Sequence, residues 1–353
     1  MHSVYFIYKG NKIPKYALAS IELAKQTSGM KIHLIGNSIF KKEVKELKID
    51  FTAIEDFYEQ NKIEEVVNKN QNLDKSFRDG FWIKTLERLF ILEQYMLKTN
   101  LQFIFHSEID QLLFRSDKLV NAIIKTNKKG IFIPFHSKNI AMASVIFINK
   151  LSAIQSLIQY ACTSAVYSNE MELIAAWSKI NPKLVFALPT LATEIKGSSN
   201  IVPNGIKTIS AAEIEGLVDA AQLGQWVAGI DPLNVPITNT PSTKFVDKPE
   251  KWLLSEDNLK HIKLKLSQNN MFLNAQFASR NFKIYNLHLH SKIHKNIVSN
   301  NPSILSLISL SNLSCKTSFK GMRFVQFQYY LYQFCTKSFL INYFQKKILK
   351  FLK

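Results

Sequence analysis

The sequence predicts an α/β protein in which helices flank a mixed, mainly parallel sheet. Val4–Tyr8 and Lys31–Ile35 have the apolar runs of short buried strands, and Pro14–Thr27 between them has apolar residues at helical spacing. A strand, a helix and a strand in this order form a parallel unit, whose loops at the carboxyl ends of the strands are available to a ligand. With 353 residues, of which 46% are hydrophobic, the chain can bury a full core.

The rest of the chain is consistent with this class up to about residue 300. Further elements are predicted as helices at Phe81–Leu97 and Glu170–Trp177, and as strands at Leu101–Phe105, Ile131–Pro134, Ala143–Ile148, Val185–Leu188 and Phe282–His288. Residues 55–79 are polar and are expected to form a helix or a loop. Residues 196–250 are richer in Gly, Pro, Ser and Thr, which favours a loop-rich insertion around one short helix near Asp219–Val227.

Charge is distributed unevenly along the chain. The net charge is +18, yet no acidic residue follows Asp257, while 15 of the 45 lysines and arginines do. The first 257 residues therefore carry 30 basic and 27 acidic groups and are nearly neutral. A basic block of this kind usually meets an anionic partner such as lipid head groups, nucleic acid or phosphates; the alternative is a solvated basic surface.

Cysteine content and the first residues bear on the compartment. Cys162, Cys315 and Cys335 are odd in number and far apart, which argues against a disulfide framework or a zinc site and fits a reducing compartment. The apolar run before Lys9 is shorter than a secretory signal requires, and no run of about 18 apolar residues occurs. We therefore expect a cytoplasmic protein without a membrane span.

Two acidic residues directly follow a predicted strand. Glu108 and Asp110 come after Leu101–Phe105, and alternation along an extended chain would place both carboxylates on one side of the sheet edge. Carboxylate oxygens bind hard divalent cations, which neutralise a nucleotide diphosphate. The alternative is an acidic turn, because acidic residues commonly follow strands.

Histidines and lysines gather at the end of the last predicted strand. His288 and His290 are two residues apart, so one imidazole is in a position to complete the ligands of this cation, and Lys292 or Lys295 would then lie near the phosphates. On the helix beginning at Phe81, Lys84 and Arg88 share a face and are candidates for binding phosphate or sugar. A surface histidine cluster and a solvated helix face are the alternatives.

The order helix, strand, acid pair, strand and histidine resembles GT-A glycosyltransferases, and most closely the retaining galactosyl- and glucosyltransferase type with a bacterial lipopolysaccharide branch. The stretches that carry the resemblance are Val4–Tyr8, Thr85–Leu89, His106–Phe114 and Ala143–Asn149, with looser matches at Asn169–Leu173 and His288–Lys292. The resemblance covers roughly residues 1–190 and 282–296. It implies a Rossmann-like GT-A domain over residues 1–300, divided into a nucleotide-sugar half (1–150) and an acceptor half (151–300).

The resemblance also implies roles for individual residues. Asp110 would be the principal ligand of Mn²⁺ or Mg²⁺, with Glu108 in place of the usual first aspartate and His288 or His290 completing the shell. Tyr8, Lys84, Arg88, Ser144 and Lys292 would contact the donor, most readily a UDP-sugar. Glu170 lies where the family carries an acidic or amide residue beside the reacting carbon, and is the candidate base if configuration is inverted. In the insertion, Asp219, Gln225 or Trp226 would face an acceptor sugar.

The resemblance and the C-terminal composition together predict where the enzyme acts. Residues 301–353 are predicted to form a basic helical tail, with ten aromatic residues between 323 and 353. Such a tail suits the head-group boundary of an anionic membrane, which would place the enzyme on the inner face of the cell membrane beside a glycan or lipid-linked acceptor for surface polysaccharide. The tail packing on the core is the alternative. A nucleic-acid-binding protein is the alternative function, although no nucleic-acid motif occurs and no such partner is expected.

Overall fold

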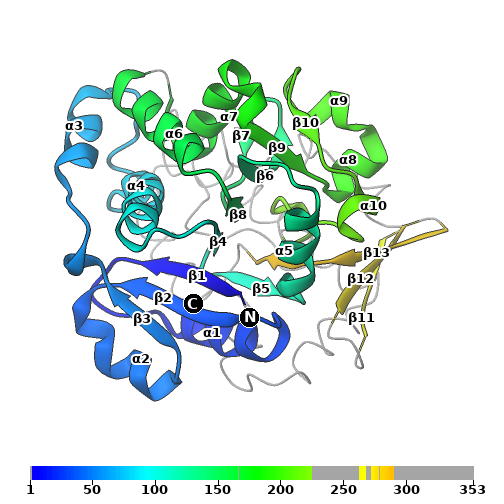
Figure 1. The fold of residues 1–353 in the computed structure, drawn as a ribbon, viewed down its shortest axis with the longest axis horizontal. Coiled ribbons are helices and arrows are strands. Elements are labelled where there is room, and N and C mark those ends of the chain that lie inside the picture. Colours follow the sequence, from blue (N-terminus) through cyan, green and yellow to red (C-terminus); the bar gives the residue numbers. More distant parts are fainter. Residues whose placement is uncertain (1, 166, 225–261, 268–271, 278, 290–353) are drawn as a thin grey trace, which may run out of the picture.

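The computed structural model describes residues 2–165, 167–224, 262–267, 272–277 and 279–289. Within them, nine strands form one sheet in the order β10-β9-β6-β8-β4-β1-β2-β3, with β7 paired to β6 (Figure 1). The strands are β1 (Ser3–Tyr8), β2 (Lys31–Gly36), β3 (Asp50–Ala53), β4 (Ile104–Ser107), β6 (Ile131–Ser137), β7 (Ile140–Ala141), β8 (Val145–Ile148), β9 (Val185–Leu188) and β10 (Lys207–Thr208).

The sheet is parallel except around β8 and the short β7. Strands β1, β2, β3 and β4 run in one direction, as do β6, β9 and β10, and β8 joins the two groups by pairing antiparallel with both β4 and β6. Because β1, β2 and β4 are parallel, the loops that follow them leave the sheet at one edge, where ligands of open α/β sheets usually bind. The predicted mixed, mainly parallel sheet is confirmed.

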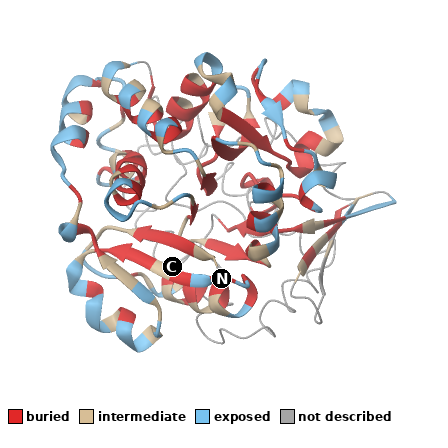
Figure 2. Cartoon of the chain, viewed as in Figure 1, coloured by how far each residue is buried: buried red, intermediate tan, exposed pale blue. Residues whose placement is uncertain are grey.

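Helices cover both faces of this sheet (Figure 1). They are α1 (Lys15–Thr27), α2 (Lys41–Leu47), α3 (Asn61–Lys69), α4 (Phe81–Thr99), α5 (Ser116–Lys125), α6 (Leu151–Thr163), α7 (Glu170–Ile180), α8 (Leu191–Lys196), α9 (Ser198–Ile201) and α10 (Ala211–Ile214). Alternation along β1 assigns the faces: Val4 and Phe6 join a core with α1 and α5, whereas Tyr5 and Ile7 join a core with α4, α6 and α7. The strands are accordingly buried and the outer helix surfaces exposed (Figure 2).

Two small sheets lie beside the main one. Strand β5 (Gln111–Leu113) pairs antiparallel with β14 (Asn286–His288), and β11 (Ile262–Ser267), β12 (Phe272–Phe277) and β13 (Arg280–Ile284) form a three-stranded meander. The single strand predicted at Phe282–His288 is therefore wrong, because the chain leaves the meander at Tyr285 and pairs with β5 instead. The Tyr285 N–H donates to the carbonyl of Leu217 at this break, and its own carbonyl accepts from Phe114.

Some helices were predicted and others were not. Helix α3 lies within residues 55–79, which were expected to form a helix or a loop, whereas α5 and α6 were not predicted, although both bury apolar residues at helical spacing. None of the helices in the described part of the chain combines the length and apolar character needed to cross a bilayer. Residues 225–250 of the insertion, with Gln225 and Trp226, lie outside the described residues, as do His290, Lys292 and the predicted tail at 301–353.

Candidate functional site

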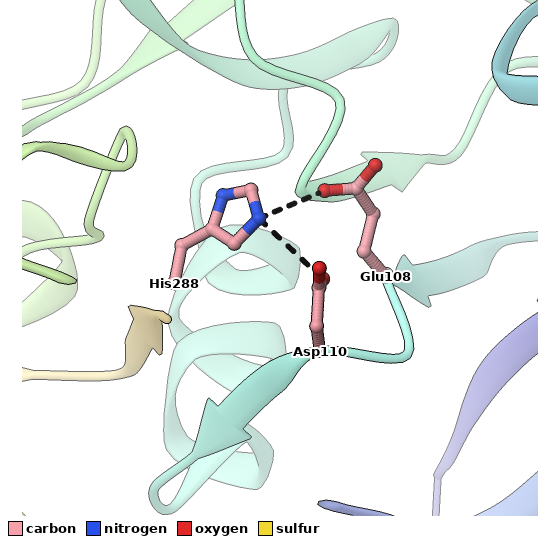
Figure 3. Close-up of side chains that lie close together, drawn as sticks. All are labelled: Glu108, Asp110 and His288. Atoms are coloured by element: carbon pink, nitrogen blue, oxygen red, sulfur yellow. Dashed lines mark ion pairs between the residues drawn. The ribbon is translucent and has the colours of Figure 1, made fainter. Parts of the chain in front are cut away.

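Three potential metal ligands converge beyond the carboxyl end of β4. The Nε2 atom of His288 lies 3.4 Å from Glu108 Oε2 and 3.4 Å from Asp110 Oδ1 (Figure 3). One ligand atom from each side chain lies within 4.8 Å of the other two. Two carboxylates and one imidazole are a donor set suited to Mn²⁺ or Mg²⁺, with positions left over for phosphate oxygens or water. These residues therefore fit the divalent cation that the sequence predicts.

A turn, and not strand alternation, brings the two carboxylates together. Strand β4 ends at Ser107, and residues 108–110 form a turn in which the Gln111 N–H donates to the Glu108 carbonyl at 3.3 Å. The Glu108 N–H donates to the carbonyl of Ser144 at 2.8 Å, which fixes the turn against the start of β8. His288 arrives from a distant part of the sequence because β14 pairs with β5, where it stands opposite Gln111. The expectation that strand geometry aligns Glu108 and Asp110 is wrong, although their convergence is observed.

Arg88 links this cluster to a third carboxylate. Its Nη2 atom lies 2.5 Å from Glu108 Oε1 and 3.6 Å from Glu170 Oε1. Glu170 is the first residue of α7, where Asn169 caps the helix by accepting from the N–H groups of residues 171 and 172. The Thr85 hydroxyl donates to Glu170 Oε2 at 2.7 Å. From helix α4, Arg88 therefore contacts Glu108, and Arg88 and Thr85 both contact Glu170.

The electrostatic balance of the cluster favours positive charge. Glu108, Asp110 and Glu170 face a single guanidinium, so the group is net negative when all three are ionised. Burial raises the pKa of Glu170 to about 7, and Glu108 adds to the rise while Arg88 and Thr85 oppose it. Burial alone would lower the pKa of His288, but Asp110 and Glu108 outweigh it and raise the pKa. The rise at His288 shows that the two carboxylates favour a positive charge beside them, whereas the rise at Glu170 comes mainly from its burial.

A cavity of about 900 Å³ opens at the same edge of the sheet, and Glu108, Asp110 and His288 are not among the residues that line it. It lies between the loops after β1 and β2, helix α3 and the first turns of α4. Its polar lining includes Lys9, Asn11, Asn37, Asn68, Lys84 and Glu87. Its volume is at the upper end of the range of small-molecule sites. Its amides, its two lysines and the three carboxylates of Glu64, Asp79 and Glu87 offer both donors and acceptors.

The cavity and the cluster are neighbours through β1, β4 and α4. In the parallel pair, Phe6 stands beside Ser107, and β1 continues to Tyr8, so the loops after β1 and β4 leave the sheet at the same edge. On α4, Lys84 and Glu87 line the cavity, while Arg88 reaches Glu108. Lys84 and Arg88, which helical spacing predicts on one face of α4, contact different features, the cavity and Glu108 respectively.

The structure places the remaining predicted residues as follows. Tyr8 lines the cavity, and its hydroxyl donates to the Lys12 carbonyl at 2.9 Å. Ser144 is buried and holds the acidic turn through its carbonyl. Asp219, expected to face an acceptor sugar, is 2% exposed and turned inward, because backbone amides surround its carboxylate. That expectation is wrong.

Three polar side chains at the site were not predicted. Lys9 Nζ lies 2.8 Å from Glu87 Oε1 across the cavity wall, and Thr85 bonds to Glu170. Lys9 had a usable signal, because it directly follows the first strand of a parallel unit, where ligands commonly bind. Glu87 and Thr85 had none, since their position within the stretch Thr85–Leu89 did not reveal which polar groups they contact.

No protein-family model matches the sequence, and no curated protein matches it. Among solved structures, mouse xyloside xylosyltransferase 1 is similar in fold, with a TM-score of 0.37 and 10% identity over 53% of this chain and 85% of that one. For an active-site mutant of LgtC the TM-score is 0.35 and the identity is 12%, over 59% of this chain and 73% of that one. For a putative nucleotide-diphospho-sugar transferase from Desulfovibrio desulfuricans the TM-score is 0.34 and the identity is 11%, over 57% of this chain and 89% of that one. Likenesses this remote do not establish an activity, so the functional conclusion depends on the residues themselves.

Proposed function

We propose that this protein is a divalent-metal-dependent GT-A glycosyltransferase that transfers a sugar from a nucleotide-sugar donor. The observation that carries the proposal is the cluster of Glu108, Asp110 and His288 at one edge of a mainly parallel sheet, with a cavity of about 900 Å³ at the same edge. The cavity has the size and polarity for a nucleoside, and the cluster has the ligands for a cation that would meet its diphosphate.

Each group at the site then has a defined task. Glu108, Asp110 and His288 would hold the cation, which when bound neutralises the diphosphate and makes it a better leaving group. Arg88 holds Glu108 in place at 2.5 Å. Lys84, which lines the cavity, supplies positive charge toward the phosphates, and Tyr8 contributes to the wall around the nucleoside. Lys292, in the part of the chain not described, is proposed as a further phosphate contact.

Glu170 is the group that bears on stereochemistry. Its pKa of about 7 suits a carboxylate that exchanges a proton near neutral pH, so it fits the role of base in an inverting reaction. In a retaining reaction the departing phosphate accepts the acceptor's proton, and Glu170 would instead hold Arg88 and face the reacting carbon. The anomeric configuration of the product, measured by NMR, distinguishes the two courses.

We further propose a glycan or lipid-linked acceptor used in surface polysaccharide synthesis, reached from the cytoplasmic face of the cell membrane. Support comes from the charge distribution, since all 15 basic residues after Asp257 are without an acidic neighbour in that segment. An anionic membrane surface would attract such a segment and bring the site to a lipid-linked acceptor.

A donor panel tests the proposed function. Purified protein is incubated with UDP-, GDP- and CMP-sugars and Mn²⁺, and release of free nucleotide is measured with and without EDTA. We expect release from one donor, most readily a UDP-sugar, and its loss when the metal is chelated. Release that is unaffected by EDTA would contradict the metal site. Pyrophosphate release from nucleoside triphosphates and sugar phosphates, without turnover of any nucleotide sugar, would contradict the transferase itself.

A further inference from the structure

A buried aspartate holds the backbone of the metal-binding histidine. Asp219 is 2% exposed, and its carboxylate accepts three hydrogen bonds from backbone amides. Oδ1 accepts from Leu223 at 3.0 Å, and Oδ2 accepts from Gly224 at 2.9 Å and from His288 at 3.1 Å. Hydrogen bonds to a charged acceptor are stronger than neutral ones, and an amide that loses such a partner in the interior is left desolvated. The arrangement therefore fixes the backbone of His288 at the end of β14.

An asparagine connects this aspartate to the acidic turn. The Asn286 side chain accepts from the Asp219 N–H at 2.9 Å and donates to the Asp219 carbonyl at 3.1 Å and to Gln111 Oε1 at 2.8 Å. Gln111 directly follows Asp110 and stands opposite His288 in the β5–β14 pair. Three segments that are distant in sequence, around residues 111, 219 and 287, are thus joined by one buried network.

Gly224 allows the close approach that this network requires. A Cβ atom at this position would overlap the carbonyl group of His288, which is backbone and cannot rotate away. A side chain here would push β14 away from the segment that contains Asp219. The glycine and the aspartate therefore act together on the same short stretch of backbone.

We propose that Asp219 is a positioning residue, which holds His288 at the distance from Glu108 and Asp110 that a cation needs. The inference depends on the metal site of the proposed function. Partners of this kind typically change metal affinity 10- to 100-fold when they are replaced. Without the bonds to Oδ2, the end of β14 is free to shift, and the imidazole no longer converges with the two carboxylates.

The test measures Mn²⁺ binding to the full-length protein, independently of turnover. Wild type, Asp219→Asn and Gly224→Ala are compared by calorimetric titration and by the ¹⁴N modulation that a bound imidazole imposes on the Mn²⁺ electron-spin-echo signal. Asn70→Ala is the matched control, because Asn70 is a buried side chain that also bonds to loop backbone, at residues 72, 73 and 167, but touches none of the cluster. Thermal melting in EDTA verifies that each variant is folded.

In Asp219→Asn and Gly224→Ala we expect the Kd for Mn²⁺ to rise at least tenfold and the nitrogen modulation to weaken. In Asn70→Ala we expect both to stay at their wild-type values. Wild-type affinity in the two variants would overturn the inference. Weaker binding with an intact nitrogen modulation would also overturn it, since His288 would still be in place. Wild-type protein that binds no Mn²⁺ would instead remove the proposed metal site, and the inference with it.

Discussion

Glu108 and Asp110 lie on one turn, but their neighbours differ. Arg88 Nη2 lies 2.5 Å from Glu108 Oε1, and His288 Nε2 lies 3.4 Å from both carboxylates. The guanidinium therefore neutralises part of the charge of Glu108. This close ion pair competes with a cation for Glu108, which gives the two residues unequal weight in the proposed chemistry.

Replacing Asp110 with alanine should abolish transfer and weaken donor binding while the fold is kept. Removing a principal ligand costs several kcal/mol of stabilisation of the leaving group, or about 100-fold or more in rate. Glu108→Ala should reduce the rate less. The measurement is nucleotide release over a range of Mn²⁺ concentrations, with circular dichroism as the control for folding. Asp110→Ala protein that turns over at the wild-type rate would contradict the assignment.

The buried carboxyl of Glu170 should make stability depend on pH. Below the ordinary value of 4.5, Glu170 is protonated in both folded and unfolded chains. Between about 4.5 and 7 the unfolded chain releases its proton while the folded chain keeps it, so the free energy of unfolding falls as pH rises, by at most about 1.4 kcal/mol per unit. Glu170→Gln should therefore gain stability relative to wild type across this window.

Urea denaturation of both proteins at intervals between pH 4.5 and 8 measures this difference. Glu172→Gln is the matched control, because it lies on the same helix and its carboxylate accepts from the Ser168 N–H and hydroxyl. Stability curves of wild type and Glu170→Gln that stay parallel across the whole range would show that the Glu170 carboxyl is not held protonated in the folded chain.

At the scale of elements, the beginning of α7 couples helix stability to the site. Asn169 accepts from the N–H groups of Met171 at 3.1 Å and Glu172 at 3.0 Å, and Glu170 follows it directly. Asn169→Ala should cost about 1 kcal/mol of stability through the lost cap. It should also lower the rate of transfer, because the first turn of the helix sets where the Glu170 carboxylate meets Arg88 and Thr85.

Thr190→Ala is the control, because the Thr190 hydroxyl caps α8 by accepting from the Thr193 N–H and belongs to a helix that carries none of the cluster residues. We expect both variants to lose similar stability in urea denaturation and only Asn169→Ala to lose turnover. Equal turnover in the two variants would show that the start of α7 affects the helix alone.

At the scale of the whole molecule, charge separates a nearly neutral part from a cationic one. The first 257 residues carry 30 basic and 27 acidic groups, and the remaining 96 carry only basic ones. A uniformly basic segment is attracted to an anionic surface, and each lysine close to such a surface contributes about 1 kcal/mol at physiological ionic strength. This distribution is the basis for proposing peripheral attachment.

Full-length protein should float with anionic vesicles at low salt and be released at about 1 M NaCl, where the screening length falls to about 3 Å. Replacing Lys346, Lys347, Lys350 and Lys353 with glutamine should weaken attachment about 1000-fold, from four contributions of about 1 kcal/mol. Neutral vesicles are the control for apolar binding. Equal flotation of the variant and wild type would contradict attachment through these lysines.

Periodicity in the sequence was enough to predict the opening β-α-β unit, α4 and the acidic pair after β4, because alternation and helical spacing are local properties of the chain. It did not reveal that a turn aligns Glu108 with Asp110, that β14 brings His288 across from β5, or that Arg88 meets Glu170 from another helix. The first of these depends on a local turn. The other two depend on contacts between segments 60 or more residues apart, and local spacing in the sequence does not encode the register of such contacts. Asp219 shows the limit most clearly: an acidic residue in a loop suggested a surface role, but the packing of three distant segments surrounds it with amides in the interior.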